Sequence, residues 1–132
     1  MATMLKVKSD LAPQDVKDHL AYFVEAAKTL HLETKSFAEH KALNKLYEQL
    51  AGFQDDILET LMGYTGERIG ATVVVDLPEY SKDEPAKLTK EIMDFAYVLY
   101  EWAGKKKYCD IENMAQSLSG SAARCAYLLT LK

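Results

Sequence analysis

The sequence is poor in cysteine and proline. Its 132 residues include two cysteines, Cys109 and Cys125, which form no C-x-x-C pair. We therefore interpret both as reduced thiols in a reducing compartment and not as parts of a disulfide framework. The three prolines, Pro13, Pro78 and Pro85, lie at expected element boundaries. The long proline-free stretches between them favour helices.

Long apolar runs are also missing. No stretch approaches the 18 or so uninterrupted apolar residues that a membrane span requires, so we expect no membrane segment. Residues 1–10 lack the apolar centre of a secretory signal peptide. The expected location is therefore the cytoplasm of the cell that makes the protein.

The charge balance is slightly acidic, with 16 Lys and Arg against 20 Asp and Glu and a net charge of −4. Such a surface does not favour nucleic acid by bulk electrostatics, so DNA binding would need a local basic patch. The hydrophobic content of 48% and the charged content of 27% are ordinary globular values, which excludes a disordered chain. The length fits a single domain over residues 1–132.

Apolar residues recur at steps of three and four along four segments, which predicts four helices. We expect them at about residues 13 to 31–33, 37–63, 85–103 and 110–129.

Local signals mark several helix ends. Ser36 is the expected N-cap of the second helix, with Glu39 reaching back in a capping box. Gly104 is the expected C-terminal stop of the third helix. Asp110 is the expected N-cap of the fourth.

The stretch 63–84 breaks the helical pattern and contains a β-prone run at 71–75. A single strand would have no partner in this chain, so we expect an extended crossover with room for a short helical turn at 64–70. Short connections elsewhere and this one long link predict that the third helix runs parallel to the second. The predicted fold is therefore all-α, a ferritin-like four-helix bundle with one long crossover between helices 2 and 3.

The strongest candidate site lies along the second helix. Asp55 and Glu59, one turn apart, place two carboxylates together, and these repel unless a cation lies between them. His31 and His40 bracket the short loop between the first two helices, and imidazoles with carboxylates suit Fe, Zn or Mn. The alternative remains open that the acids are solvated surface groups and the histidines helix-end hydrogen-bonding groups. One face of this helix carries His40, Asn44, Tyr47, Ala51, Asp55 and Glu59.

The motif Glu-x-x-His is absent from the sequence. Bundles that hold a di-iron site within one subunit carry it on two helices. Any metal site of this chain is therefore expected between subunits.

The segment from His31 to Tyr47, HLETKSFAEHKALNKLY, followed by Asp55-Asp-Ile-Leu-Glu59, resembles the Dps proteins, the ferritin-like miniferritins of starved cells. Their motif has a histidine that closes the first helix and one that opens the second. An Asp-x-x-x-Glu pair follows fifteen residues after the second histidine, as it does here. The resemblance covers the first, second and fourth helices and is closest from His31 to Glu59. Small phage-encoded relatives share this kind of pattern.

The resemblance implies a homo-oligomer built from dimers, as far as a hollow dodecamer, with a ferroxidase site at the dimer interface. His31 and His40 would come from one subunit, and Asp55 and Glu59 from the other. Such a site binds Fe²⁺, lets peroxide or oxygen oxidise it, and stores the ferric mineral.

Two departures from the Dps motif bear on this site. The loop between the histidines is about three residues shorter than in the family, and the acidic residue expected four positions after the second histidine is Asn44, a neutral and poor iron ligand. The basic N-terminal DNA-binding tail is reduced to Lys6 and Lys8, so we expect no DNA binding. The rival interpretation is a non-enzymatic oligomeric binding or assembly protein, such as a phage accessory factor, in which the histidines serve an interface.

Overall fold

The computed structural model describes residues 10–71, 73 and 75–131 of the chain. In that part the chain forms helices and no strand, which confirms the all-α class. The helices are α1 (Pro13–Glu33), α2 (Phe37–Thr65), α3 (Glu84–Lys106) and α4 (Cys109–Leu129). At the standard rise, the 29 residues of α2 span about 43 Å.

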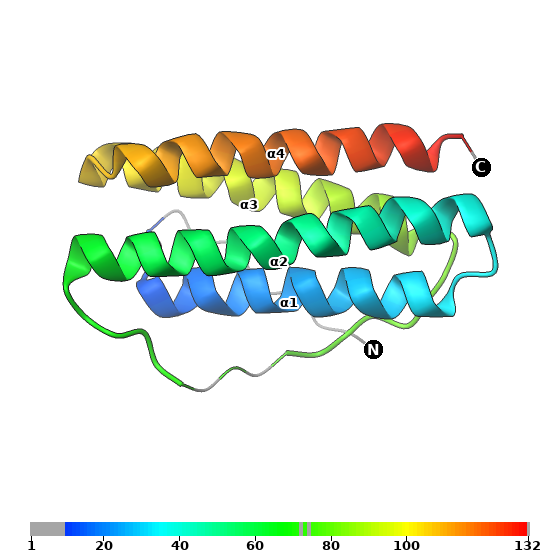
Figure 1. Cartoon of the computed structure of the whole chain (residues 1–132), viewed down its shortest axis with the longest axis horizontal. Helices are drawn as coiled ribbons and strands as arrows, with labels where there is room; N and C mark the ends of the chain where they lie inside the picture. The colour runs from blue at the N-terminus through cyan, green and yellow to red at the C-terminus, as the bar shows by residue number, and fades with distance from the viewer. Residues whose placement is uncertain (1–9, 72, 74, 132) are drawn as a thin grey trace.

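The four helices lie side by side (Figure 1). α1 packs against α2 and α3, and α4 packs against the same two helices, so α2 and α3 face each other across a diagonal. Neighbouring helices run in opposite directions, whereas α2 and α3 run in the same direction (Figure 1). A chain that joins two parallel helices must return along their length, which is why the connection from α2 to α3 is long.

The core consists of the apolar stripes that the three-and-four spacing predicts. Every position of the expected stripes on α1 and α3 is buried, and α3 adds Phe95 and Trp102. The expected positions are Val16, Leu20, Phe23, Val24, Ala27 and Leu30 on α1, and Leu88, Ile92, Ala96, Leu99 and Ala103 on α3. On α2 and α4 a few stripe residues, among them Phe53 and Met114, are only partly buried at the edge of the core. The largest fully buried side chains come from all four helices: Leu20, Phe23, Leu30, Leu43, Leu46, Leu50, Ile57, Leu61, Ile92, Phe95, Leu99 and Ile111.

The link between α2 and α3 is extended in its described residues. Thr72 and Val74 of the β-prone run lie outside the described residues, as do Lys6 and Lys8, and the remaining link residues form neither strand nor helix. α2 continues to Thr65, where Gly66 ends it with a left-handed φ of 73°, so the helical turn allowed at 64–70 does not form.

Hydrogen bonds from both ends of this link hold it on the bundle. The Lys17 ammonium of α1 donates to the Gly70 carbonyl. The Tyr80 hydroxyl donates to the Glu39 carboxylate of α2 at 2.5 Å. The link therefore passes over α1 and reaches the first turn of α2.

The predicted stop at Gly104 is wrong. α3 continues to Lys106, and Lys107 ends it with a left-handed φ of 62° while the Tyr108 amide donates to the Ala103 carbonyl at 2.8 Å. A Cβ on Gly104 would lie 3.2 Å from a carboxylate oxygen of Glu112, so this glycine allows α3 to pass close to the first turn of α4.

The predicted N-cap of α4 is also displaced. Tyr108 occupies the cap position and Asp110 lies within the first turn. The Tyr64 hydroxyl at the end of α2 donates to Asp110 Oδ2 at 3.3 Å and accepts from the Asp110 amide at 3.4 Å. The Asp110 carboxylate therefore bonds to a tyrosine of another helix and does not cap α4. It still lies in the first turn, at the positive end of the helix dipole.

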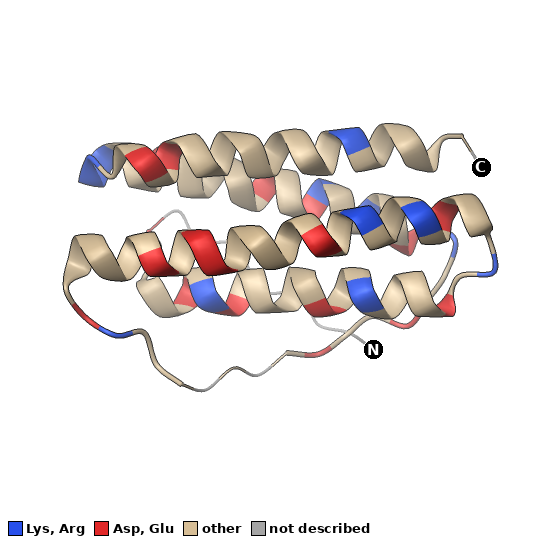
Figure 2. Cartoon of the chain, in the orientation of Figure 1, with Lys and Arg blue, Asp and Glu red and all other residues tan. Residues whose placement is uncertain are grey.

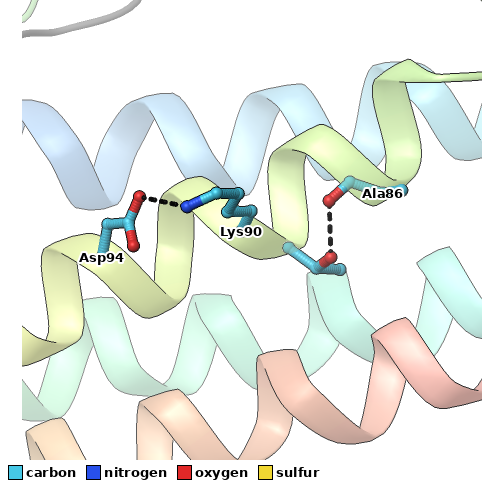
Figure 3. A network of polar contacts seen from close by, with 4 residues as sticks. Ala86, Lys90 and Asp94 are labelled. Carbon is cyan, nitrogen blue, oxygen red and sulfur yellow. Dashed lines mark hydrogen bonds and ion pairs between the residues drawn. The ribbon is translucent and has the colours of Figure 1, made fainter.

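On the outer surface of α3, Lys90 and Asp94 form an ion pair of 3.3 Å one helical turn apart (Figure 3). Beside them the Thr89 hydroxyl donates to the Ala86 carbonyl at 2.7 Å. In the described part of the chain, no helix combines the length and the apolar character needed to cross a membrane.

Candidate metal centre

The structure brings His31 and His40 together. His31 lies in the last turn of α1 and His40 in the first turn of α2, joined by a loop of three residues. Their rings stack with centroids 4.9 Å apart and planes 29° from parallel. His31 is buried, with 8% of its surface exposed, and His40 is half-buried. We call these two residues the histidine pair.

Each ring of the histidine pair is oriented by a backbone carbonyl. His31 Nδ1 lies 2.5 Å from the Lys28 carbonyl oxygen, and His40 Nδ1 lies 2.5 Å from the His31 carbonyl oxygen. A carbonyl only accepts, so Nδ1 is the donor in both rings and Nε2 is the nitrogen left for another partner. No hydrogen bond among the described residues uses either Nε2. In metal sites, a hydrogen bond from one ring nitrogen to a backbone carbonyl fixes the orientation of a histidine whose other nitrogen binds the metal.

Tyr47 completes an aromatic stack on the pair. Its ring lies 5.5 Å from the His31 ring at 21°, and Lys28 Nζ lies 6.0 Å from the centre of the tyrosine ring. The position of Tyr47, two turns after His40, follows from the helical spacing. Lys28 was not singled out from the sequence, although its place three residues before His31 is a signal that could have suggested it.

The two predicted carboxylate ligands lie elsewhere on α2. Asp55 and Glu59 are both exposed. They follow His40 by 15 and 19 residues, which at the helical rise is about 22 and 28 Å along the axis. Among the described residues, no three His, Cys, Asp or Glu side chains converge closely enough to hold a metal ion. One copy of the chain therefore supplies imidazoles at one place and carboxylates at another.

Asn44, the neutral residue in the Dps-type acidic position, has a partner on the same face. Its side-chain amide donates to Glu48 Oε1 at 3.2 Å. Glu48 is exposed and lies one turn further along α2. The nearest carboxylate beyond the histidine pair on this face is thus that of Glu48, a residue that the sequence motif did not indicate.

A buried carboxylate supports the loop that carries the histidine pair. Glu39 is 1% exposed, and its Oε1 accepts from the Thr34 hydroxyl at 2.7 Å as well as from Tyr80. Ser36 caps α2 as predicted, since its hydroxyl accepts from the Glu39 amide at 3.2 Å. The Ser36 amide, for which we predicted the Glu39 carboxylate as acceptor, donates to the Thr34 hydroxyl at 3.1 Å. The loop and the link are thereby joined to the residue before His40.

A second set of ionisable groups is buried between α1 and α3. Burial raises the pKa of Glu91 to about 7, with Glu84 and Asp94 adding to the rise and Lys87 opposing it. Burial, followed by the charge of Glu91, raises the pKa of Tyr22 to about 12.

Nearby, the His19 ring stacks on Phe95 at 4.6 Å, and its Nε2 is buried without a hydrogen-bond partner. Burial also raises the pKa of the Cys125 thiol to about 11, in keeping with a packing role.

Comparison with known proteins places these residues in a family. The sequence profile of a "Family of unknown function (DUF5856)" matches residues 31–129, a span that begins at the first histidine of the pair. The chain is 29% identical over 114 residues to the "Uncharacterized 14.6 kDa protein in mobD-ri intergenic region" of Enterobacteria phage T4. That alignment covers 85% of this chain and 80% of the phage protein. No solved structure matches the chain.

Proposed function

The chain belongs to the family of unknown function DUF5856, and we propose that it binds and oxidises Fe²⁺ at a site shared between two copies. In each site His31 and His40 of one copy supply imidazole nitrogens, and Asp55 and Glu59 of the other supply carboxylates. The observation that carries the proposal is the histidine pair, stacked and with each Nδ1 bonded to a backbone carbonyl, so that each Nε2 is left for another partner.

The arrangement of the helices supports this proposal. A long link between two diagonal, parallel helices is the connection of a ferritin-like bundle, and we propose that the chain is a member of that fold in the manner of Dps proteins. The phage relative fits a small, divergent form of the fold.

The distances within one chain explain why a second copy is needed. The carboxylates lie about 22 Å or more beyond His40 on the same helix, by the helical rise. A two-fold axis that pairs the α1–α2 side of one copy with the same side of another would run the two α2 helices in opposite directions. The histidine pair of each copy then faces Asp55 and Glu59 of its mate, and the dimer holds two equivalent sites.

The ligand set suits iron as a substrate. Two neutral imidazoles and two carboxylates give a mixed nitrogen and oxygen set, which binds first-row divalent cations. Two Fe²⁺ ions give one electron each to a peroxide molecule, whose O–O bond breaks, and two protons complete two water molecules. With Asn44 in place of an acid, the site carries less negative charge than in the Dps motif, so weaker Fe²⁺ affinity is expected.

One observation favours the rival function of an assembly protein. Leu32 and Phe37, on either side of the loop beside the histidine pair, are 68% and 75% exposed. Large apolar side chains at such exposure suit a protein contact. In that case the histidine pair packs in an interface and takes no part in electron transfer.

Anaerobic addition of Fe²⁺ followed by peroxide distinguishes the two functions. The iron proposal predicts growth of the ferric absorbance in the near ultraviolet, lost in His40→Ala and in Asp55→Ala. Asp56→Ala is the matched control, because Asp56 is an exposed acid next in the chain that points about 100° away around α2. The proposal is overturned if wild type oxidises Fe²⁺ no faster than buffer, or if Asp56→Ala loses as much activity as Asp55→Ala.

A further inference from the structure

The exposed side of α4 differs from the exposed sides of the other helices. Between Glu112 and Leu131 the helix and its end carry one charged residue, Arg124. Figure 2 shows α4 uncoloured over most of its length, whereas α1 and α2 carry acidic and basic residues along theirs. The exposed side chains of α4 between these limits recur at the three-and-four spacing of a helix-packing face. This α4 outer face consists of Asn113, Gln116, Ser117, Gly120, Ala123, Arg124 and Tyr127.

Exposure confirms that the bundle itself leaves this face uncovered. Tyr127 is 61% exposed, and a Cβ placed on Gly120 would meet nothing within 4 Å. On the opposite side of α4, Leu118 and Ala122 are fully buried. α4 thus buries one face within the chain and leaves the opposite face exposed.

We propose that the α4 outer face binds the same face of a second copy, with the two α4 helices antiparallel and Gly120 on the two-fold axis. This inference does not depend on the proposed iron site, which lies on the α1–α2 side. In such an isologous contact, residues at equal distances before and after Gly120 oppose each other.

The opposed pairs are chemically complementary. Gln116 lies four residues before Gly120 and meets Arg124, four residues after it, and its side-chain carbonyl can accept from the guanidinium. Because the two helices are antiparallel, the exact partners are set by sequence distance from the axis: the fourth residue before Gly120 opposes the fourth after it.

The small and terminal pairs follow the same rule. Ser117 opposes Ala123, and two small residues on each side of the axis let the backbones approach. Asn113 opposes Tyr127, whose hydroxyl can bond the amide. No pair places two like charges opposite each other.

The glycine sets how closely the helices can approach. Cα atoms lie about 2.3 Å from a helix axis, so helices about 8–10 Å apart bring the Cα atoms of two facing glycines to about 3.4–5.4 Å. Only a residue without a long side chain fits on that axis.

The nearly uncharged surface of the α4 outer face, as well as its shape, favours a second copy as the partner. The chain has a net charge of −4, so two copies repel on average, and the repulsion is least where both present an uncharged surface. A basic or acidic partner would find a single charge, Arg124, to engage on this face. Self-association is therefore the contact for which the α4 outer face is best matched.

The native mass of Gly120→Arg tests the proposal. The replacement puts two long cations on the axis, and we expect the particle mass to fall at least twofold below that of wild type. Gly63→Arg is the matched control, because Gly63, on α2, is likewise an exposed helical glycine whose Cβ would meet nothing within 4 Å. Both changes raise helix propensity, so the fold is retained. A monomeric wild type, or equal masses for wild type and Gly120→Arg, overturns the proposal.

Cross-linking tests the axis itself. With Cys109→Ser removing the exposed native thiol, Gly120→Cys is expected to form a disulfide-linked dimer under a mild oxidant such as oxidised glutathione. A disulfide needs Cα atoms about 4.4–6.8 Å apart, which facing residues on the axis can reach. Gly63→Cys in the same background is expected to remain uncrosslinked. Equal cross-linking of the two variants contradicts the α4 contact. His40→Ala, which tests the iron site, is expected to leave the Gly120 cross-link unchanged.

Discussion

Replacement of Glu91 by glutamine is expected to change how the stability of the bundle depends on pH. Glu91 is 9% exposed between α1 and α3, and burial raises the pKa of its carboxyl from 4.5 to about 7. On α3 the charges of Glu84 and Asp94 add to the rise and that of Lys87 opposes it. The charge of Glu91 in turn helps to raise the pKa of Tyr22 on α1.

The direction follows from the raised pKa of the folded state. Below pH 4.5 the carboxyl is protonated in both states and has no effect on the free energy of unfolding. Between pH 4.5 and 7 the folded state holds a proton that the unfolded state has released, so stability falls as pH rises. At about 1.4 kcal/mol per pKa unit, the loss is on the order of 3 kcal/mol and levels off above pH 7.

Urea denaturation followed by circular dichroism at several pH values between 4.5 and 8 measures this loss. We expect wild type to lose roughly 2–3 kcal/mol more than Glu91→Gln over that range. Asp56→Asn is the control, because Asp56 is an exposed carboxylate on α2 that has no part in raising the pKa of Glu91. If Glu91→Gln and wild type lose stability in parallel, Glu91 ionises normally in the folded bundle and the reasoning from burial is wrong.

Three further predictions concern stability and nucleic acid. Tyr80→Phe removes a hydroxyl that donates to the buried Glu39 carboxylate, and a loss of about 1–3 kcal/mol is expected in the same urea assay; an unchanged midpoint would show that water replaces the hydroxyl. Gly52→Ala, at an exposed α2 position with nothing within 4 Å, should raise stability by about 0.8–1 kcal/mol in thermal denaturation, and a decrease would mean that this position is covered. In a gel-shift titration at physiological salt we expect no DNA complex, and a salt-sensitive shift would contradict the argument from net charge.

Much of the fold follows from local patterns in the sequence. The three-and-four spacing predicts every helix, because burial on one face of a helix imposes that period. The ends were harder to predict where tertiary contacts decide them. Gly104 lies inside α3 at a point where α4 passes close to it, and Asp110, inside the first turn of α4, is engaged by Tyr64 of α2. Neither contact is visible in the neighbouring residues alone.

The candidate site, too, could be predicted from the sequence only where its contacts are local. The two histidines bracket a short loop, so their proximity could be predicted, and the structure confirms it. The Tyr80 contact to Glu39 joins residues 41 apart in sequence, so no local signal announces it. The meeting of Asp55 with the histidine pair requires a second copy, and a single chain contains no pattern that specifies its neighbour. That part of the site stays a prediction.

Mixing two inactive variants tests the shared site most directly. One variant, His31→Ala with His40→Ala, keeps its acids, and the other, Asp55→Ala with Glu59→Ala, keeps its histidines. Each alone is expected to lack peroxide-dependent Fe²⁺ oxidation. After the two are unfolded together and refolded, each mixed dimer regains one complete site, so activity should return to about a quarter of wild type, because about half of the dimers are mixed and each holds one site of two. Full inactivity of the mixture, with mixed dimers verified by native mass spectrometry and with wild type active, would contradict a site built from two copies.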